Sequence, residues 1–511
     1  MEDSLRLYEL AHQISFPVII STGDQFFPYA LRPPGYEKIY TIFSYSKLIV
    51  DEIQTYNPKA IAIITKLIED IYYMGGKFLI MTATLPDMVK ERILERVDQT
   101  AINLVNIYEE EKDTLSQIKK HRMELLEIDN DEEYLDEVIR EASNGMRVLV
   151  ILNTVKKAQE VYKALRKRTE ENNAALKNRL WLLHSRFTLW DRKQKEVELL
   201  EREFKNPKPL GEIEGKILVA TQVVEASLDI DADVLFTEIA PMDSLVQRMG
   251  RIFRRVGPQF RLKEEQGEKY IYFSPKGEEY SIDLNKPNVH ILVYSKSLES
   301  GRGRVYEKDL LLITLKIIED KSIDIEFIRD WLRQIRSKGN IERFLDNQKE
   351  IVLSEYDKYC LVNKLYKGLP EDSNYFKSFN KMLDILESGY MSDKKEEAQR
   401  IFREIYDVEI LPENRLDEFV KDIKSFFDIY GENARFSVFK KEVLSKFIVS
   451  MSYSSIKASL SESDKVYYKL EEKSLFGEEE INKLKRWTSG IFILNVKYCS
   501  ELGILSGESE S

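Results

Sequence analysis

The sequence predicts an α/β protein built on parallel sheets and followed by a mostly helical segment. Short apolar runs recur in the first part of the chain, and most of them end in small or polar residues. Amphipathic helical patterns lie between these runs. From about Val305 onward the pattern becomes long and amphipathic, and the polar pairs at the ends of apolar runs stop. Uninterrupted apolar strands that alternate with amphipathic helices are typical of parallel sheets covered by helices on both faces.

Seven apolar runs are predicted to be strands: Pro17–Ile20, Leu48–Val50, Phe78–Met81, Val148–Leu152, Leu180–Leu183, Ile217–Ala220 and Val234–Ile239. Helices are predicted between them, for example over Lys59–Tyr73 and Val155–Arg166. Ligands of such folds collect where parallel strands end at their carboxyl side. The polar residues that follow the runs are therefore the first candidates for a functional site.

Three domains are expected, over residues 1–110, 111–300 and 301–511. The charged stretch Glu109–Ser116 is predicted to be a hinge, and Pro258–Asn288 an insertion with a hairpin around Tyr270–Phe273. The third domain is expected to be mostly helical, with helices over Leu310–Asp320, Ile325–Ser337, Tyr375–Ser388 and Leu416–Tyr430.

Composition excludes several classes of function. The 511 residues carry 77 Lys and Arg against 88 Asp and Glu, a net charge of −11, which argues against a basic coat for nucleic acid. A groove that holds phosphates with backbone amides stays open. Cys360 and Cys499 are far apart, and the four histidines form no His-Asp dipeptide, so zinc, disulfide and histidine-rich di-metal sites are not expected. We expect a cytoplasmic protein without a membrane-spanning segment.

Asp51 and Glu52 follow the apolar run Leu48–Val50 directly. Two adjacent carboxylates at a buried strand end are costly unless a cation or hydrogen bonds compensate them. In NTP hydrolysis such an Asp holds Mg²⁺, and the following Glu orients or deprotonates the attacking water. The alternative is a surface turn or a helix N-terminus, where acidic residues are also favoured. The neighbouring I-Q and the later T-A-T favour the hydrolytic interpretation.

Two further strand ends carry hydroxyl and amide groups. Thr82-Ala83-Thr84 could link the acidic pair to a neighbouring domain, or simply cap the strand. Thr221 and Gln222 follow another run and could hold a nucleic-acid backbone, while Asp229 is placed to reach a ribose or an Arg. A polar loop with a helix cap is the alternative for each of these residues.

The block Gln247–Arg254, Q-R-M-G-R-I-F-R, is the most specific motif. Arg offers a planar, always-charged fork to phosphate. Gln247 and Arg248 are expected to begin a helix face on which Arg251 and Arg254 follow at successive turns, aimed at a polyphosphate. A solvated basic helix is the alternative.

His184-Ser185-Arg186 also follows an apolar run. A lone His at such a place is usually a packing or capping group. The adjacent hydroxyl and Arg favour a functional role.

Together these residues resemble a superfamily-two helicase, and more specifically the helicase portion of the type I CRISPR effector helicase–nuclease. The resemblance runs from about Val18 to His290, with a weaker echo near the C-terminus. Its strings are I-I-S-T-G-D-Q-F-F, V-D-E-I-Q-T-Y, M-T-A-T-L-P, V-L-V-I-L-N-T-V-K-K-A-Q, L-L-H-S-R-F-T-L-W-D-R, A-T-Q-V-V-E-A-S-L-D-I-D and Y-C-S-E-L-G-I-L. Gln54 stands where the family has His, and Thr82 where it has Ser.

The resemblance implies a partial first RecA-like domain, a complete second one, and ATP hydrolysis that drives translocation on single-stranded DNA exposed by a Cascade-type complex. Asp51 would serve Mg²⁺, Glu52 the water, Arg251 and Arg254 would be arginine fingers, and Gln247 would sense the γ-phosphate. Coupling to ATP would involve Thr82, Thr84, Asp229 and Arg248. Nucleic-acid contacts would come from Thr22, Thr154, His184, Arg186, Thr221 and Gln222.

The chain also departs from the family. It contains no G-x-x-x-x-G-K-[ST], so the phosphate-cradling loop is missing, and so is the HD nuclease domain. We expect an N-terminally truncated motor that needs a separate polypeptide with a P-loop and a nuclease domain, and that is ATPase-deficient alone. Its first sheet is expected to have uncovered apolar edges. The alternatives are a non-catalytic DNA- or Cascade-binding remnant and, less favoured by the motif strings, an RNA helicase.

Overall fold

The computed structural model describes residues 16–505 except 24–25, 33–34, 83–84, 173, 210, 227, 339–349, 389–406, 457–458, 462–463 and 474. Its contacts divide the chain into two compact units. The first comprises residues 1–112, 307–340 and 356–402, and the second comprises 113–306, 341–355 and 403–511. These units combine segments from all three expected domains, whose boundaries stay a prediction.

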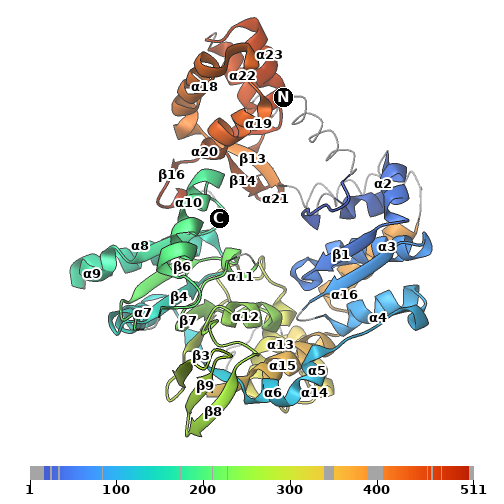
Figure 1. Ribbon diagram of the computed structural model, residues 1–511, viewed down its shortest axis with the longest axis vertical. Helices are drawn as coiled ribbons and strands as arrows, with labels where there is room; N and C mark the ends of the chain where they lie inside the picture. The colour runs from blue at the N-terminus through green and yellow to red at the C-terminus, as the bar shows by residue number, and fades with distance from the viewer. Residues whose placement is uncertain are drawn as a thin grey trace. The chain divides into compact units, whose positions relative to one another are not determined.

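The second unit is built on a seven-stranded sheet with the order β12-β3-β11-β7-β4-β6-β5. Figure 1 labels β3, β4, β6 and β7 of this sheet. The strands are β3 (Lys119–Ile128), β4 (Arg147–Ile151), β5 (Leu180–Leu183), β6 (Lys216–Ala220), β7 (Val234–Glu238), β11 (Val289–Tyr294) and β12 (Glu350–Ser354). All neighbours run parallel except β12, which is antiparallel to β3. The predicted α/β fold with parallel strands is confirmed.

The apolar runs become the central strands because both of their faces are covered. Every residue of β4, β6, β7 and β11 is buried. The core on one face includes Leu135 and Val138 of α7 (Glu132–Ser143) and Leu165 of α8 (Val155–Asn172). The insertion forms a three-stranded antiparallel sheet of β8 (Arg261–Gln266), β9 (Lys269–Phe273) and β10 (Glu279–Asp283), which confirms the hairpin expected around Tyr270–Phe273.

The end of the chain adds a smaller sheet to the second unit. β13 (Asp407–Pro412) pairs with β14 (Val449–Ser452) and β15 (Ile491–Leu494), and α18 (Leu416–Tyr430) and α23 (Glu478–Trp487) pack over it through an aromatic core. Two short strands, β16 (Tyr498–Cys499) and β17 (Gly503–Ile504), follow. The helix predicted over Leu416–Tyr430 is confirmed.

The first unit has a sheet of only two described strands, β1 (Lys47–Asp51) and β2 (Lys77–Met81), which are parallel. Helix α3 (Pro58–Tyr73) packs against one face, and its N-terminus is capped by Asn57, whose side chain accepts a hydrogen bond from the Ala60 amide at 3.0 Å. Helix α16 (Asn374–Glu387) completes this core with Phe379 and Met382. Helices α13 (Lys308–Glu319) and α14 (Ile325–Lys338) confirm two further predictions from the sequence.

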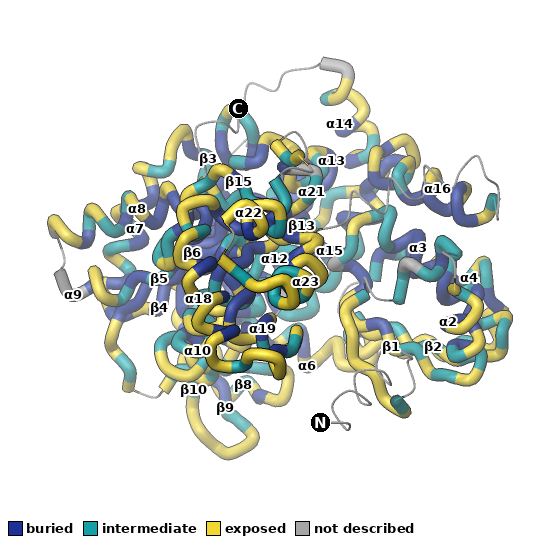
Figure 2. The backbone as a smooth tube through the Cα atoms, turned by 90° about the horizontal axis from the view of Figure 1, so that it is seen from above, coloured by how far each residue is buried: buried dark blue, intermediate teal, exposed yellow. Residues whose placement is uncertain are grey.

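The other face of the two-stranded sheet is exposed. Ile49 is 60% exposed, Leu79 49% and Met81 45%. Figure 2 shows the contrast with the buried strands of the second unit. The strand predicted over Pro17–Ile20 is wrong, because these residues are irregular and Ile20 is 96% exposed. An apolar run becomes a strand only where a paired neighbour completes its hydrogen bonds, and no described strand takes that place.

No described helix is both long and apolar enough to cross a lipid bilayer.

Candidate functional site

The carboxyl ends of β4, β6 and β5 lie side by side in the second unit and bring together several residues predicted from sequence. Thr154 follows β4, His184 follows β5, and Thr221 and Gln222 follow β6. The Thr221 amide donates to the Leu183 carbonyl at 3.2 Å, and the Gln222 side-chain amide donates to the Asn153 carbonyl at 2.9 Å. These bonds fix three strand ends as one polar edge.

The edge contains both exposed and buried groups. Thr154 caps helix α8, because its hydroxyl accepts from the Lys157 amide at 3.2 Å, and the hydroxyl also lies 3.3 Å from the Ser300 hydroxyl. Thr221 is buried, whereas Gln222 and Arg186 are half-buried. Among the predicted contacts at this edge, Thr154, Gln222 and Arg186 are therefore the ones with surface to offer a ligand.

His184 is fully buried, and both ring nitrogens are used inside the protein. Nδ1 accepts from the Arg186 amide at 3.1 Å, so Nε2 carries the proton that it donates to the Leu502 carbonyl at 3.0 Å. Burial lowers the pKa of His184 to about 3, although the bond to Leu502 opposes this shift. The ring is therefore neutral, and it supports the loop rather than presenting a group to a ligand.

The arginine block departs from the helix predicted for it. Helix α12 (Met242–Met249) contains Gln247 and Arg248 but ends at Met249, so the expectation that Arg251 and Arg254 lie on the same helix face is wrong. Ile252 instead forms a parallel bridge with Ala232, and Phe253 takes a left-handed conformation with φ 47°. Gly250 weakens the helix at this point, and the bridge and the buried Ile252 side chain stabilise the turn.

Arg248 is fully buried and uses its whole guanidinium. Its Nε donates to Glu225 at 2.7 Å. The two terminal nitrogens donate to the Thr237 hydroxyl at 2.7 Å, the Glu238 carbonyl at 3.0 Å, the Asn153 side chain at 3.0 Å and the Tyr306 hydroxyl at 3.0 Å. Arg248 therefore joins the ends of β4 and β7 to helices α11 (Val223–Ala226) and α12, and it is a structural group in this structure.

The other members of the block differ in exposure. Arg251 is largely buried and donates to the carbonyls of Val224, at 2.9 Å, and Glu225. The Arg254 side chain is 38% exposed and donates to Asp229 at 2.5 Å. Burial would raise the pKa of Asp229, but hydrogen bonds from Asn206 and Arg254 outweigh it and lower that pKa. Gln247 is half-buried.

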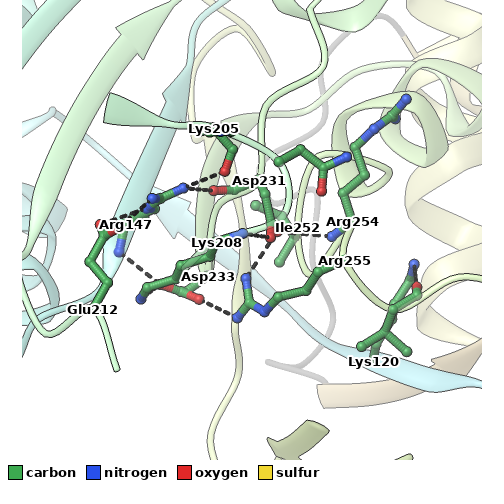
Figure 3. Close-up of polar contacts among 12 residues, drawn as sticks. Lys120, Arg147, Lys205, Lys208, Glu212, Asp231, Asp233, Ile252, Arg254 and Arg255 are labelled. Atoms are coloured by element: carbon green, nitrogen blue, oxygen red, sulfur yellow. Dashed lines mark hydrogen bonds and ion pairs between the residues drawn. The ribbon is translucent and has the colours of Figure 1, made fainter. Parts of the chain in front are cut away.

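A buried network of charges lies beneath the block (Figure 3). Arg255 pairs with Asp231 at 2.9 Å and with Asp233 at 2.5 Å, and Asp231 also accepts from the Arg254 amide at 3.0 Å. Arg147 donates to the Asp231 carbonyl at 3.1 Å and forms a two-pronged pair with Glu212 at 2.9 and 2.6 Å. The network fixes the backbone at residues 254 and 255 while the Arg254 side chain points away from it.

Sequence reasoning missed this network and the acceptors around Arg248. Asp231 stood in a quoted motif without a role, and Arg255 follows the block directly. The positions of these acidic and basic residues in the sequence do not indicate that their side chains pair. The contact of Arg147 with Asp231 spans 84 positions, so only the fold could reveal it.

The acidic pair lies at the end of β1 in the first unit. Asp51 and Glu52 are exposed, and Glu52 takes a left-handed conformation with φ 51°, which is strained for a residue with a Cβ. The Glu52 amide donates to the Met81 carbonyl at 2.9 Å. The side chain of Gln54 is buried, donates to Glu52 and accepts from the Thr82 hydroxyl, so it bridges the two motifs.

For two of the predicted site residues the structure gives little or no information on contacts. Thr22 is exposed in an irregular segment. Thr84 lies outside the described residues.

The chain is similar to a known family at the level of sequence. Residues 144–256 match the model for the C-terminal part of the CRISPR-associated nuclease/helicase Cas3. A CRISPR-associated nuclease/helicase Cas3 of Methanothermobacter thermautotrophicus is 26% identical over 366 residues, which is 69% of this chain and 39% of the relative. The CRISPR-associated endonuclease/helicase Cas3 of Escherichia coli is 33% identical over 230 residues, 41% of this chain and 25% of the relative.

The fold is similar to that of a solved member. The crystal structure of T. fusca Cas3 with AMPPNP matches with a TM-score of 0.61 at 16% identity, over 95% of this chain and 55% of the other. The chain thus has the fold of Cas3-type helicases with RecA-like domains. It carries a Cas3-like C-terminal helicase domain, is homologous to the Cas3 nuclease/helicases, and spans well under half the length of the curated relatives above.

The burial of Arg248 yields a first prediction. Arg248→Lys should lower the free energy of unfolding by about 3 kcal/mol, because an ammonium cannot reach five acceptors and leaves several of them unpaired in the core. Arg254→Lys, in the exposed part of the same block, should stay within about 0.5 kcal/mol of the wild type. Urea titrations followed by circular dichroism measure both. Equal stability of the two variants would contradict the structural role of Arg248.

Glu238 yields a prediction about pH. Burial raises the pKa of Glu238 to about 7, although the amide and hydroxyl of Ser300 donate to it. The folded state therefore holds the proton more tightly, and this contribution to stability is lost as pH rises from about 4.5 through 7. Glu238→Gln removes the ionisation, so its stability relative to the wild type should increase by up to about 3 kcal/mol between pH 5 and pH 8.

Urea unfolding at the two pH values measures this difference. Glu201→Gln, at an exposed position of the same unit, is the matched control and should show no such change. If Glu238→Gln differs from the wild type in free energy of unfolding by the same amount at both pH values, Glu238 is already ionised at pH 5.

Proposed function

We propose that the chain is the motor part of a CRISPR interference helicase, an ATP-dependent translocase on single-stranded DNA. The homology of residues 144–256 to the Cas3 C-terminal part is the observation that carries this proposal. The polar edge over β4, β6 and β5 supports it, because its hydroxyl, amide and guanidinium groups suit a phosphate backbone. A solved structure of similar fold is described as a CRISPR RNA-guided surveillance complex before nicking. A Cascade-type complex is therefore the proposed partner, and the cytoplasm the proposed location.

Single-stranded DNA would lie along the polar edge, with Arg186, Thr154 and Gln222 as direct contacts. Arg186 is half-exposed, and a guanidinium can pair with a phosphate by two parallel hydrogen bonds. His184 and Thr221 are buried and would act by supporting the backbone of this edge. Thr22, in the first unit, is a separate proposed contact with nucleic acid.

ATP with Mg²⁺ is the proposed cofactor. Among the described residues no group of three or more His, Cys, Asp or Glu side chains could hold a metal ion. Asp51 alone would hold a hydrated Mg²⁺ together with phosphate oxygens, which is how Mg²⁺ is usually held at nucleotide sites. The bound ion would neutralise phosphate charge. Glu52 would orient the attacking water, and Gln54 and Thr82 hold the Glu52 carboxylate in place.

Arg251 and Arg254 are the proposed arginine fingers, and Gln247 the proposed γ-phosphate sensor. Arg254 is the more accessible of the two, because its partner Asp229 is exposed. Arg251 would have to leave two carbonyl groups to reach a phosphate. We therefore assign the larger part of the catalytic contribution to Arg254. Arg248 and Asp229 would couple these groups to the rest of the unit.

We further propose that these 511 residues do not hydrolyse ATP by themselves and need a P-loop polypeptide. The sequence contains no G-x-x-x-x-G-K-[ST]. The exposed Ile49, Leu79 and Met81 support this proposal, because a parallel sheet is normally covered on both faces. The alternative is a non-catalytic remnant that binds DNA or a Cascade-type complex.

DNA binding gives the first test. The chain should bind a fluorescent single-stranded oligodeoxynucleotide, with an affinity that falls as salt increases. Arg186→Ala should weaken binding about fivefold to tenfold, because one charge-assisted contact to phosphate is lost. Arg140→Ala is the control, since Arg140 is exposed on α7 ahead of β4, at the amino end of the strands. Fluorescence anisotropy measures both, and tighter binding of an RNA of the same sequence would favour the RNA helicase alternative.

ATP turnover gives the second test. Phosphate release by the purified chain should equal that of Glu52→Gln, with or without single-stranded DNA. Turnover that Glu52→Gln abolishes would overturn the proposed deficiency. Addition of a recombinant polypeptide carrying the P-loop segment of a family member should restore DNA-stimulated turnover, and Arg254→Ala should then abolish most of it. No restoration, with DNA binding intact, would favour the remnant.

A further inference from the structure

The closing segment, residues 498–505, leaves the C-terminal sheet and packs against the polar edge of the seven-stranded sheet. The Ile504 amide donates to the Arg186 carbonyl at 3.0 Å, and His184 donates to the Leu502 carbonyl at 3.0 Å. The side chain of Gln159, on α8, donates to the carbonyls of Leu502, at 2.5 Å, and Ile504, at 2.7 Å. Residues 184–186 and 502–504, which are more than 300 positions apart in the sequence, are thus paired through both backbone and side-chain hydrogen bonds.

Tyr498 extends this contact to helix α10 (Leu189–Glu198). Its buried hydroxyl accepts from the Thr188 amide at 3.1 Å and donates to Asp191. Thr188 is the N-cap of α10, because its hydroxyl accepts from the Asp191 amide at 3.2 Å. At its other side, the backbone of Tyr498 makes two hydrogen bonds with the Asn414 side chain, at 2.9 and 3.0 Å. Tyr498 therefore joins the C-terminal sheet region to the start of α10.

Gly503 is the position where the two stretches approach most closely. It has φ +71°, and a Cβ there would lie 2.5 Å from the Arg186 carbonyl oxygen and 2.7 Å from His184 Cε1. A Cβ at either distance would clash with these atoms, so the two stretches would have to move apart. The left-handed conformation itself also favours Gly. The sequence Leu502-Gly503-Ile504 is therefore fitted to the loop that it covers.

We propose that the closing segment is a positioning element that fixes residues 184–188 so that Arg186 can contact a single-stranded nucleic acid. This inference rests on the proposed function for the nature of the ligand. The amide of Arg186 is held by His184 and its carbonyl by Ile504, whereas its side chain stays half-exposed. A side chain on a fixed backbone loses less conformational entropy when it binds, so the affinity depends on the segment that fixes it.

The test uses the full chain with Gly503→Ala, which should displace the closing segment. Gly431→Ala is the matched control, because Gly431 also has a positive φ, of +48°, in the C-terminal part, but nothing lies within 4 Å of a Cβ placed there. The chain has four histidines, so NMR of protein labelled with ¹⁵N-histidine can follow the neutral Nε2–H form of His184 directly. Gly503→Ala should shift this signal, and Gly431→Ala should leave it unchanged.

Fluorescence anisotropy with a single-stranded oligodeoxynucleotide then tests the consequence. Gly503→Ala should weaken binding about tenfold, comparable to the loss of one or two hydrogen bonds, and Gly431→Ala should bind like the wild type. Tyr498→Phe, which keeps the ring and loses the hydroxyl, should weaken binding less, and it serves as the test if Gly503→Ala does not fold.

The outcomes are distinct. An unchanged His184 signal in Gly503→Ala overturns the contact, and a shifted signal with unchanged DNA affinity overturns the positioning role alone. If Tyr498→Phe is the test, unchanged DNA affinity overturns that role. A wild-type chain that does not bind the oligonucleotide overturns the proposed function, and the positioning role for DNA with it.

Discussion

The buried guanidinium of Arg248 is the interaction on which the second unit depends. A charge without exposed surface is tolerated only when every donor has an acceptor, and here five hydrogen bonds use all five N–H groups. The acceptors belong to the ends of β4 and β7, to α11 and to Tyr306. The Asn153 carbonyl also accepts a hydrogen bond from the Gln222 side chain. Asn153 therefore connects the arginine block to the polar edge.

The other arginines of this region are of two kinds: some are anchored inside the protein, and one is exposed. Arg251 is fastened to the carbonyls of α11, and Arg255 is held by Asp231 and Asp233. These two anchors leave Arg254 as the exposed cation of the block, and its side chain pairs with the carboxylate of Asp229 at the surface. Surface ion pairs contribute little to stability. Arg254 can therefore exchange Asp229 for a phosphate at small cost, whereas Arg248 cannot exchange its partners without unfolding the edge.

Much of the fold could be predicted because its signals are local. Uninterrupted apolar runs such as Val148–Leu152 predicted the buried strands, and the polar residues after them predicted which edge carries the candidate site. The end of α12 at Met249 could not be predicted, because the turn depends on the pairing of Ile252 with Ala232 across the fold. The burial of His184 had the same cause, since its partner Leu502 lies 318 positions away. A sequence pattern reports the residue type at a strand end, but not whether another segment covers it.

The seven-stranded sheet and the two-stranded sheet differ in how many neighbouring segments they need to order the residues at their strand ends. The strands β4, β6 and β7 are buried on both faces, so their register and their polar ends depend on neighbours from several parts of the chain. The strands β1 and β2 have one bare face, yet the acidic pair is already ordered, because the Glu52 amide bonds to β2 and Gln54 bridges Glu52 to Thr82. These contacts need only two adjacent strands. A phosphate cradle needs a further loop with free backbone amides, and no pair of strands can provide that. In the proposed function, the group that would orient the attacking water is therefore already held within this unit, whereas the binding of the phosphates would need a further element.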